Sequence, residues 1–297
     1  MKNIIFVVII LILIAAIGLV FWFWREQQVL SEKNNIAPPS SSEIYEPIPS
    51  ASFSPQGTLP SVGDLYQKPA ENQVIKFPIF NYHHIRPMPP ESAGVTERAF
   101  TVTPEGLEAH LKYLKENGYQ VVLLDALLDY FDTGQPLSPK AVALTFDDGW
   151  REHYSNAFPI LKKYGVRATF FVSTGWVGQP EIMSWDEMRQ MSEAGMVFGS
   201  HSISHPYLDK LSDENLKKEV EDSKKLLEEK LEKKVDYIAY PAGMYNNKVI
   251  EAVKAAGYQA ALGVYKIIEQ SPKFRWTIRR FHADDALESI TGKLVNY

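Results

Sequence analysis

The stretch KAVALTFDDG, Lys140–Gly149, carries the strongest fold signal in the chain. It opens with an apolar run typical of a buried strand, and it ends in two adjacent carboxylates and a glycine that permits a turn. Two neighbouring carboxylates repel each other, so Asp147 and Asp148 are costly at a strand end unless something neutralises them. A turn with a helix-capping aspartate is the plain alternative for so short a motif. The end of this strand is therefore a candidate site.

Apolar strands and amphipathic helices alternate on both sides of this stretch. Segments typical of strands are 74–85, 120–124, 140–148, 167–173, 196–205, 235–243 and 259–264, and segments typical of helices are 103–119, 125–134, 156–165, 184–195, 212–231 and 246–258. Such alternation predicts an α/β fold with a parallel sheet. The number of strand–helix units in about 220 residues favours one barrel-like sheet over two domains, with the chemistry at the carboxyl ends of the strands.

The N-terminal residues carry a second strong signal. Ile4–Trp24 is an uncharged run of 21 residues, long enough to cross a hydrocarbon core of about 30 Å. It ends in aromatic residues suited to the membrane interface. A cleaved signal peptide is the alternative, but its apolar region is usually only about 7–15 residues long and ends in small residues. We expect a transmembrane signal anchor at 1–25, a Pro- and Ser-rich disordered linker at 26–72 and a catalytic domain at 73–297.

The stretch GSHSISH, Gly199–His205, leaves another predicted strand and contains two histidines four residues apart. A lone histidine is more often structural. His201 and His205, combined with one carboxylate from Asp147 or Asp148, would instead offer two nitrogens and one oxygen to a divalent ion. The remaining carboxylate would be free to act as general base toward the attacking water. The pattern favours a catalytic site for zinc or a similar ion.

These two motifs, TFDDG and HSISH, resemble the first two motifs of the NodB-type polysaccharide deacetylases, carbohydrate esterase family 4. The stretch between them, AFPILKKYGVRATFFV at 157–172, resembles the same family. The resemblance extends from about Phe77 to Ala286 and so covers nearly the whole predicted domain. It implies a fold of the irregular (β/α) barrel kind.

The resemblance also implies roles for the four site residues. In the family the first aspartate is the base, and the second binds the metal beside both histidines. By this likeness Asp147 is the base, and Asp148, His201 and His205 bind one divalent ion. Zinc is the first choice for that ion, with cobalt or nickel as alternatives.

The stretch YPAGMYN, Tyr240–Asn246, matches the third family motif, an Arg-x-Pro-Tyr-Gly-like pattern, only in part. Pro241 and Gly243 agree with it, but Ala242 replaces the tyrosine and the arginine is absent. In the family the backbone N–H at the tyrosine helps to hold the oxyanion. A backbone donor survives a change of side chain, so the resemblance assigns this role to Ala242, with Tyr240 and its neighbours binding substrate. A simple turn that ends a strand is the alternative.

The missing arginine leaves the base, Asp147, without its usual orienting partner. Arg280, in TIRRFHADD, is the candidate substitute, and Arg279 is the weaker one. Trp150 is a candidate for stacking on a sugar ring. Trp185 is as well explained by packing as by a sugar cleft.

The stretch YHHI, Tyr82–Ile85, bears on the general acid. The family usually has a late Leu-x-His motif for this role, and no clear counterpart follows Gly257. PIFNYHHI instead resembles the N-terminal strand of a circularly permuted branch that includes poly-N-acetylglucosamine deacetylases. That likeness implies that His83 protonates the leaving amine, with His84 as a neighbour. His282, in RRFH, is the alternative acid.

The expected function is metal-dependent hydrolysis of N-acetyl groups on an extracytoplasmic glycan that contains N-acetylglucosamine, such as poly-N-acetylglucosamine or peptidoglycan, with release of acetate. The partners are then the glycan and, through the N-terminal helix, the membrane. A net charge of −5 gives no basic field for nucleic acid, and no protein partner is implied. The absence of cysteine excludes disulfides, thiolate metal sites and a cysteine nucleophile.

Two other functions remain open. Two histidines and one carboxylate are also the ligand set of non-haem iron oxygenases, although the α/β pattern and the lack of a His-x-Asp spacing disfavour that class. A tethered, non-catalytic glycan-binding module with a structural metal would explain the missing arginine.

Overall fold

The structure, a computed structural model, describes residues 66–265, 267–294 and 297. The predicted signal anchor and nearly all of the predicted linker lie outside the described residues. Across the part that is described, no helix is both long and apolar enough to span a membrane.

The centre of the fold is a parallel sheet with the strand order β10-β9-β8-β7-β6-β2-β12, and β5 pairs with β6 beside this path. Its strands are β2 (Ile79–Tyr82), β5 (Gln120–Val121), β6 (Ala141–Phe146), β7 (Thr169–Val172), β8 (Val197–Ser200), β9 (Tyr237–Ala239), β10 (Ala260–Leu262) and β12 (Phe281–His282). Leu262 at the end of β10 forms a parallel bridge with Ile278, just before β12. The two edges therefore curl toward each other as a half-barrel, which confirms the predicted α/β class and parallel sheet.

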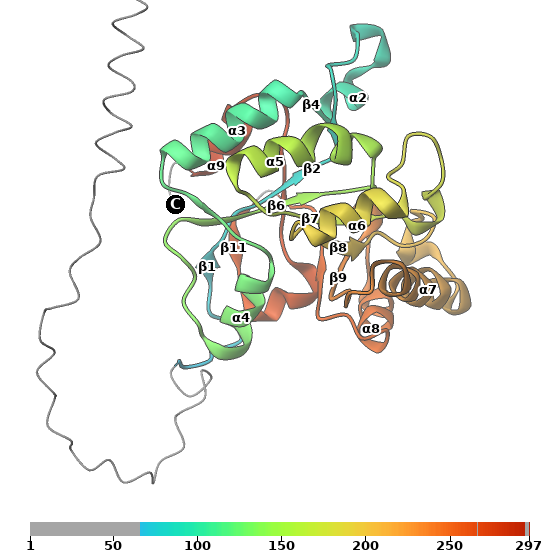
Figure 1. The fold of residues 1–297 in the computed structure, drawn as a ribbon. Helices are drawn as coiled ribbons and strands as arrows, with labels where there is room; N and C mark the ends of the chain where they lie inside the picture. The colour runs from blue at the N-terminus through green and yellow to red at the C-terminus, as the bar shows by residue number, and fades with distance from the viewer. Residues whose placement is uncertain (1–65, 266, 295–296) are drawn as a thin grey trace, which may run out of the picture. The chain divides into compact units, whose positions relative to one another are not determined.

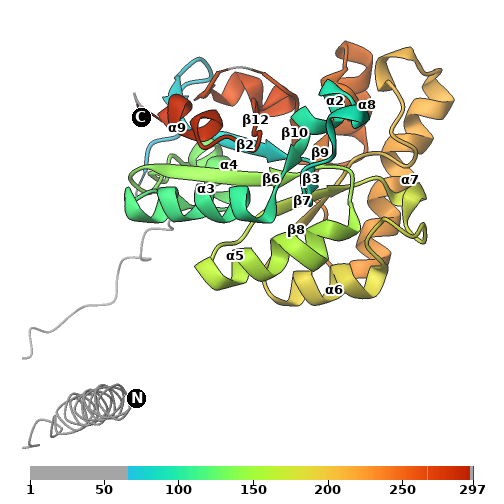
Figure 2. The ribbon, with the colours of Figure 1, turned by 90° about the horizontal axis from the view of Figure 1, so that it is seen from above.

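Helices surround the sheet (Figures 1 and 2). They are α2 (Val95–Ala99), α3 (Pro104–Glu116), α4 (Asp125–Thr133), α5 (Phe158–Tyr164), α6 (Trp185–Glu193), α7 (Asp213–Leu231), α8 (Asn247–Ala255) and α9 (Glu288–Leu294). Side-chain caps begin several of them, such as Thr103 before α3 and Ser184 before α6, each of which accepts a hydrogen bond from the first turn. Local polar chemistry thus sets where these helices begin.

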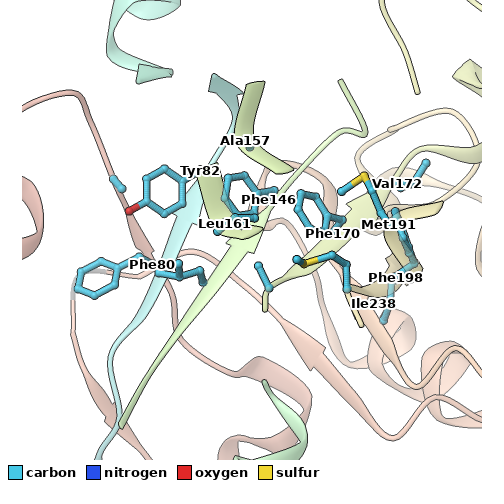
Figure 3. Close-up of a cluster of buried hydrophobic side chains, with 14 of the residues drawn as sticks. Phe80, Tyr82, Phe146, Ala157, Leu161, Phe170, Val172, Met191, Phe198 and Ile238 are labelled. Carbon is cyan, nitrogen blue, oxygen red and sulfur yellow. The ribbon is translucent and has the colours of Figure 1, made fainter. Parts of the chain in front are cut away.

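The two faces of the sheet have separate cores because side chains alternate along each strand. The outer core holds Phe80, Phe146 and Phe170 (Figure 3). Buried residues of the helices α3, α5, α6, α7 and α8 belong to the same core. The inner core holds alternate residues such as Ile79 and Ala143, with α4 packed against them. Polar residues on the inner face of these strands therefore lie inside the half-barrel.

The predicted strand at 74–85 is three short strands in the structure. β1 (Ile75–Lys76) pairs with the late strand β11 (Glu269–Gln270), whereas β2 joins the central sheet. Pro78 separates them because it has no N–H to donate to a ladder. After Tyr82 the chain leaves the central sheet, and β3 (His84–Ile85) pairs with β4 (Thr101–Val102). The YHHI stretch is therefore the point where the chain turns away from the sheet.

Candidate active site

The carboxyl ends of the central strands meet at one rim, as expected for parallel strands. A pocket of about 750 Å³ opens there. It is lined by His83, His84, Ala93, Thr96, Glu97, Phe100, Asp147, Asp148, His201, His205, Tyr240, Ala242, Gly243, Val264 and His282. The pocket brings together the FDDG, HSISH, YPAG, YHHI and RRFH motifs, which span some two hundred residues of sequence.

Asp147 is buried at the bottom of this pocket and is held at both carboxylate oxygens. Arg280 Nη1 donates to Oδ1 at 2.7 Å, and Nη2 donates to Oδ2 at 2.9 Å. Asn81 Nδ2 also donates to Oδ2, at 3.0 Å. Such a two-point pair fixes the carboxylate plane as well as its position. The structure therefore places Arg280, and not Arg279, against this carboxylate; the Arg279 guanidinium lies 3.7 Å from the centre of the Phe274 ring.

Arg280 has no exposed surface, so its other donors also need acceptors. Its Nε donates to the Gly263 carbonyl at 3.2 Å, and Nη1 also reaches Asn81 Oδ1 at 3.0 Å and Thr145 Oγ1 at 3.3 Å. Asn81 and Thr145 are register partners on β2 and β6. Sequence reasoning missed both, although a polar residue inside an otherwise apolar strand was a usable signal.

The charges around Asp147 determine its protonation state. Burial raises the pKa of the Asp147 carboxyl, but the charge and the hydrogen bonds of Arg280 more than offset this and hold the pKa below its ordinary value. Asp147 is therefore ionised at neutral pH and able to accept a proton.

Asp148, His201 and His205 converge beside it. Their ligand atoms all lie within 4.8 Å of one another. The Nε2 atoms of His201 and His205 each lie 3.5 Å from Asp148 Oδ1. Three atoms of the type that bind divalent ions thus face one point.

Hydrogen bonds outside this cluster orient the same three side chains. His201 Nδ1 donates to the Ala239 carbonyl at 2.8 Å, which leaves the lone pair of Nε2 free for a ligand. Trp150 Nε1 donates to Asp148 Oδ2 at 3.0 Å, which leaves Oδ1 toward the histidines. Burial lowers the pKa of both histidines, so each ring is neutral and able to bind a metal. The residues present therefore fit a divalent ion with two nitrogen ligands and one oxygen ligand.

The backbone is strained at three residues of the pocket. Asp148, His205 and Ala242 have φ angles of 77°, 57° and 52°, in the left-handed region that residues other than glycine seldom adopt. The loop that carries His205 is held by Glu219 of α7, whose carboxylate accepts the N–H groups of Ile203 and Ser204. Strained residues of this kind cluster at functional sites, where the surrounding structure holds them in place.

His83 lines the same pocket. Its ring packs edge-on against Phe100, with 4.6 Å between ring centres, and it lies 5.3 Å from the ring of His282. Its Nδ1 is buried and, within residues 66–265, 267–294 and 297, has no hydrogen-bond partner. Burial lowers the pKa of His83 to about 3, while the Asp147 charge acts in the opposite direction. The resting imidazole is therefore neutral and lies within the electrostatic reach of Asp147.

His282 and His84 line the same pocket with other partners. His282 Nε2 donates to the Ala99 carbonyl at 2.7 Å. His84 Nδ1 lies 2.7 Å from Glu152 Oε1, and its ring lies 4.4 Å from the Trp150 ring. Both rings thus have a nitrogen already engaged by the protein.

The other predicted residues are divided between the pocket and the core. Tyr240, Ala242 and Gly243 line the pocket, and the Tyr240 hydroxyl donates to the Trp276 carbonyl at 2.9 Å. Pro241 is buried, and Trp185 packs against the outer core.

A π-helical turn, η3 (His153–Ala157), holds the YHHI segment, and sequence reasoning missed it. Glu152, just before this turn, accepts the Ile85 N–H at 3.1 Å, and Asn156 Nδ2 donates to the Ile85 carbonyl at 2.7 Å. His153 Nε2 donates to the His83 carbonyl at 2.5 Å. We call Glu152, His153 and Asn156 the η3 clamp. The predicted helix at 156–165 gave no signal of it, because a π-turn differs from an α-turn only in its backbone pairing.

The chain resembles known proteins over most of this fold. The family described as polysaccharide deacetylase matches residues 134–261. The Bacillus subtilis protein YxkH, named as a proposed polysaccharide deacetylase, is 36% identical over 194 residues, which cover 65% of this chain and 64% of YxkH. A poly-β-1,6-N-acetyl-D-glucosamine N-deacetylase of Staphylococcus aureus is 28% identical over 206 residues, covering 64% of this chain and 71% of that protein.

Solved structures agree with these matches. The Streptococcus pyogenes deacetylase PplD in complex with acetate superposes with a TM-score of 0.69 at 28% identity, and the match covers 74% of this chain and 99% of PplD. The match to YxkH spans less than two thirds of that protein. In its motifs, its relatives and its fold, the chain is thus similar to the polysaccharide deacetylases.

Proposed function

We propose that this protein is a metal-dependent hydrolase that removes N-acetyl groups from a glycan containing N-acetylglucosamine and releases acetate. One observation carries the proposal: an ionised carboxylate, held by a buried arginine, lies beside a three-residue metal cluster in one pocket. The family and the names of the relatives point to the same chemistry.

Asp148, His201 and His205 would hold one divalent ion, with zinc as the first choice and cobalt or nickel as alternatives. Such an ion, when bound, polarises an acyl carbonyl and lowers the pKa of a water molecule. The protein contributes the fixed geometry: Trp150 and the Ala239 carbonyl orient two of the ligands before any substrate arrives.

Asp147 would take the proton from the attacking water. The Arg280 pair keeps this carboxylate ionised at neutral pH and aimed at one place, so Asp147 is able to accept a proton there. The backbone N–H of Ala242, on the pocket wall, would donate to the oxyanion that forms when water adds to the acetyl carbon.

His83 would protonate the leaving amine. Because its resting imidazole is neutral, the proton that Asp147 removes from water must reach His83 before the carbon–nitrogen bond breaks. The Asp147 charge favours the protonated form of His83. His282 is the alternative acid: its Nε2 donates to the Ala99 carbonyl, and its Nδ1, like that of His83, is buried without a partner among the described residues.

The glycan is proposed to be outside the cytoplasm. Poly-N-acetylglucosamine and peptidoglycan are the two candidates, the first supported by the name of the S. aureus relative. The apolar run at 4–24 supports a membrane anchor, with the linker at 26–72 as a tether. Loss of acetyl groups would leave free amines and make the glycan more positive.

The test is acetate release by the purified full chain from poly-N-acetylglucosamine, peptidoglycan and chito-oligomers, after metal removal and again after reloading with zinc. We expect zinc-dependent release that Asp147→Asn lowers by at least about 100-fold while its zinc content is retained. His83→Ala should lose release more severely than His282→Ala. An active Asp147→Asn would remove the assigned base, and glycan binding without any release would favour the binding-module alternative.

A further inference from the structure

Gln270, in β11, is a polar side chain with no exposed surface and no part in the proposed chemistry. Its amide makes three hydrogen bonds, all with backbone groups. Nε2 donates to the Arg279 carbonyl at 2.8 Å and to the Phe77 carbonyl at 3.3 Å, and Oε1 accepts the Arg279 N–H at 3.2 Å. A buried amide with both of its donor hydrogens engaged holds the segments that it joins at a fixed separation.

The first of these segments carries Arg280. Gln270 binds both backbone polar groups of Arg279, as a neighbouring strand would, and Arg279 directly precedes Arg280. The carbonyl of Arg280 itself accepts the Tyr265 N–H at 2.9 Å. The backbone of Arg280 is therefore held at two successive residues. A side chain that must meet a carboxylate at two points tolerates little displacement of its backbone.

The second segment leads to the other side chain that donates to the Asp147 carboxylate. Phe77 is followed by Pro78 and β2, and β2 carries Asn81. Next to the amide, β1 pairs with β11, and the Phe77 N–H donates to the Ile268 carbonyl at 2.9 Å (Figure 1). Gln270 thus joins the two segments from which the carboxylate receives its side-chain hydrogen bonds.

We propose that Gln270 is a positioning residue for the reaction: it fixes Arg280, and through Arg280 the plane of the Asp147 carboxylate. The inference rests on the proposed function. Gln270 makes no hydrogen bond with Asp147, so its effect on catalysis passes through the arginine. The alternative is that Gln270 only satisfies buried backbone groups, in which case its loss lowers stability without a specific effect on the base.

The kinetic test uses the full, zinc-loaded protein. Gln270→Met keeps the length of the side chain and removes all three hydrogen bonds. We expect kcat to fall about tenfold with a smaller change in KM, because the base is displaced while the rest of the pocket is intact. Ser271→Ala is the matched control. This neighbouring residue is also buried, and its Oγ donates to the Glu71 carbonyl at 2.8 Å without contact to Arg279, so its loss should leave kcat unchanged.

A double variant shows whether the effect passes through Arg280. Arg280→Lys keeps the buried charge but cannot form the two-point pair with Asp147. In that background, Gln270→Met should lower kcat much less than about tenfold, because no carboxylate plane remains to be fixed. Losses that multiply, or an equal loss of kcat in Ser271→Ala, would overturn the proposal. If Gln270→Met does not fold, Gln270→Glu keeps the acceptor for the Arg279 N–H and should show the same pattern with a smaller loss.

A measurement without substrate separates this inference from the proposed function. The Arg280 Nε–H donates to the Gly263 carbonyl at 3.2 Å, so NMR of arginine-labelled protein can follow its exchange with solvent. Exchange should be faster in Gln270→Met, or in Gln270→Glu, than in the unaltered protein and in Ser271→Ala. If the unaltered protein releases no acetate from any glycan, the proposed function fails, and this exchange still decides the position of Arg280. Equal exchange in all variants would overturn the positioning role.

Discussion

Arg280 is a positive charge with no exposed surface, and its only acidic partner among the described residues is Asp147. Removing one member of a buried ion pair leaves the other charge without compensation, which typically costs about 3–5 kcal/mol. Removing both members leaves no uncompensated charge. The pair therefore links the stability of the domain to the residue assigned as the base.

We expect Arg280→Met to lower the free energy of unfolding by about 3–5 kcal/mol. The double variant Asp147→Asn/Arg280→Met should be more stable than Arg280→Met alone, because neither buried charge remains. Urea denaturation of the metal-free protein at pH 7 measures both. Arg279→Met is the matched control, since it removes a partly exposed guanidinium that contacts the Phe274 and Tyr265 rings and donates to the Glu269 carbonyl, and it should cost no more than about 2 kcal/mol. A double variant as unstable as the sum of the single ones would show that the two charges are not coupled.

The site residues that could be predicted from the sequence are those that lie in a short, recognisable motif. The motifs TFDDG and HSISH place four side chains at strand ends, and the structure brings all four to one pocket. Asn81 and Thr145 needed the sheet register, because only the pairing of β2 with β6 places them beside Arg280. Arg280 became a candidate because the YPAGMYN stretch lacks the arginine of the third family motif.

Helices and strands also divide into those with a local sequence signal and those that depend on distant contacts. Helices with caps and strands with apolar runs were predicted because their signals are local, as for α3 and β6. The segment after 264, with β11, β12 and α9, gave no periodic pattern because it is held by contacts with distant strands, such as β12 with β2. The η3 clamp was missed for the same reason: it depends on which segment lies next to the π-turn.

The η3 clamp leads us to predict how one turn of the chain affects the YHHI segment. Asn156→Ala removes the donor to the Ile85 carbonyl, which should cost about 1–2 kcal/mol of stability and loosen the segment that carries His83. We expect faster amide hydrogen exchange in this segment and a fall in kcat of about 10- to 100-fold, with a smaller change in KM.

Tyr154→Phe is the control for this prediction because it removes an exposed hydrogen bond, to Gln190, from the same turn. It should change neither the hydrogen exchange nor kcat appreciably. Unchanged exchange and unchanged kcat in Asn156→Ala would mean that the clamp does not position His83.

The metal cluster joins parts of the molecule that are far apart in sequence. Asp148 follows β6, whereas His201 and His205 follow β8, two strands further along the sheet. An unfolded chain would hold these groups far apart, so an ion that binds all three binds the folded state almost exclusively. Linkage then requires the ion to stabilise the whole fold and not only the site.

We therefore expect zinc at 100 times its dissociation constant to stabilise the full chain by about 2.7 kcal/mol. In a domain of this size, each kcal/mol shifts the melting temperature by about 2–4 °C, so Tm should rise by about 5–10 °C. Calorimetry with and without zinc measures the shift, and a chelator should reverse it. His205→Ala removes one ligand from a partly exposed position, so its metal-free Tm should stay close to that of the unaltered protein while most of the zinc-dependent shift disappears. A zinc-dependent shift of the same size in His205→Ala would place the stabilising ion elsewhere in the molecule, because a site that loses one of three ligands cannot keep its full affinity.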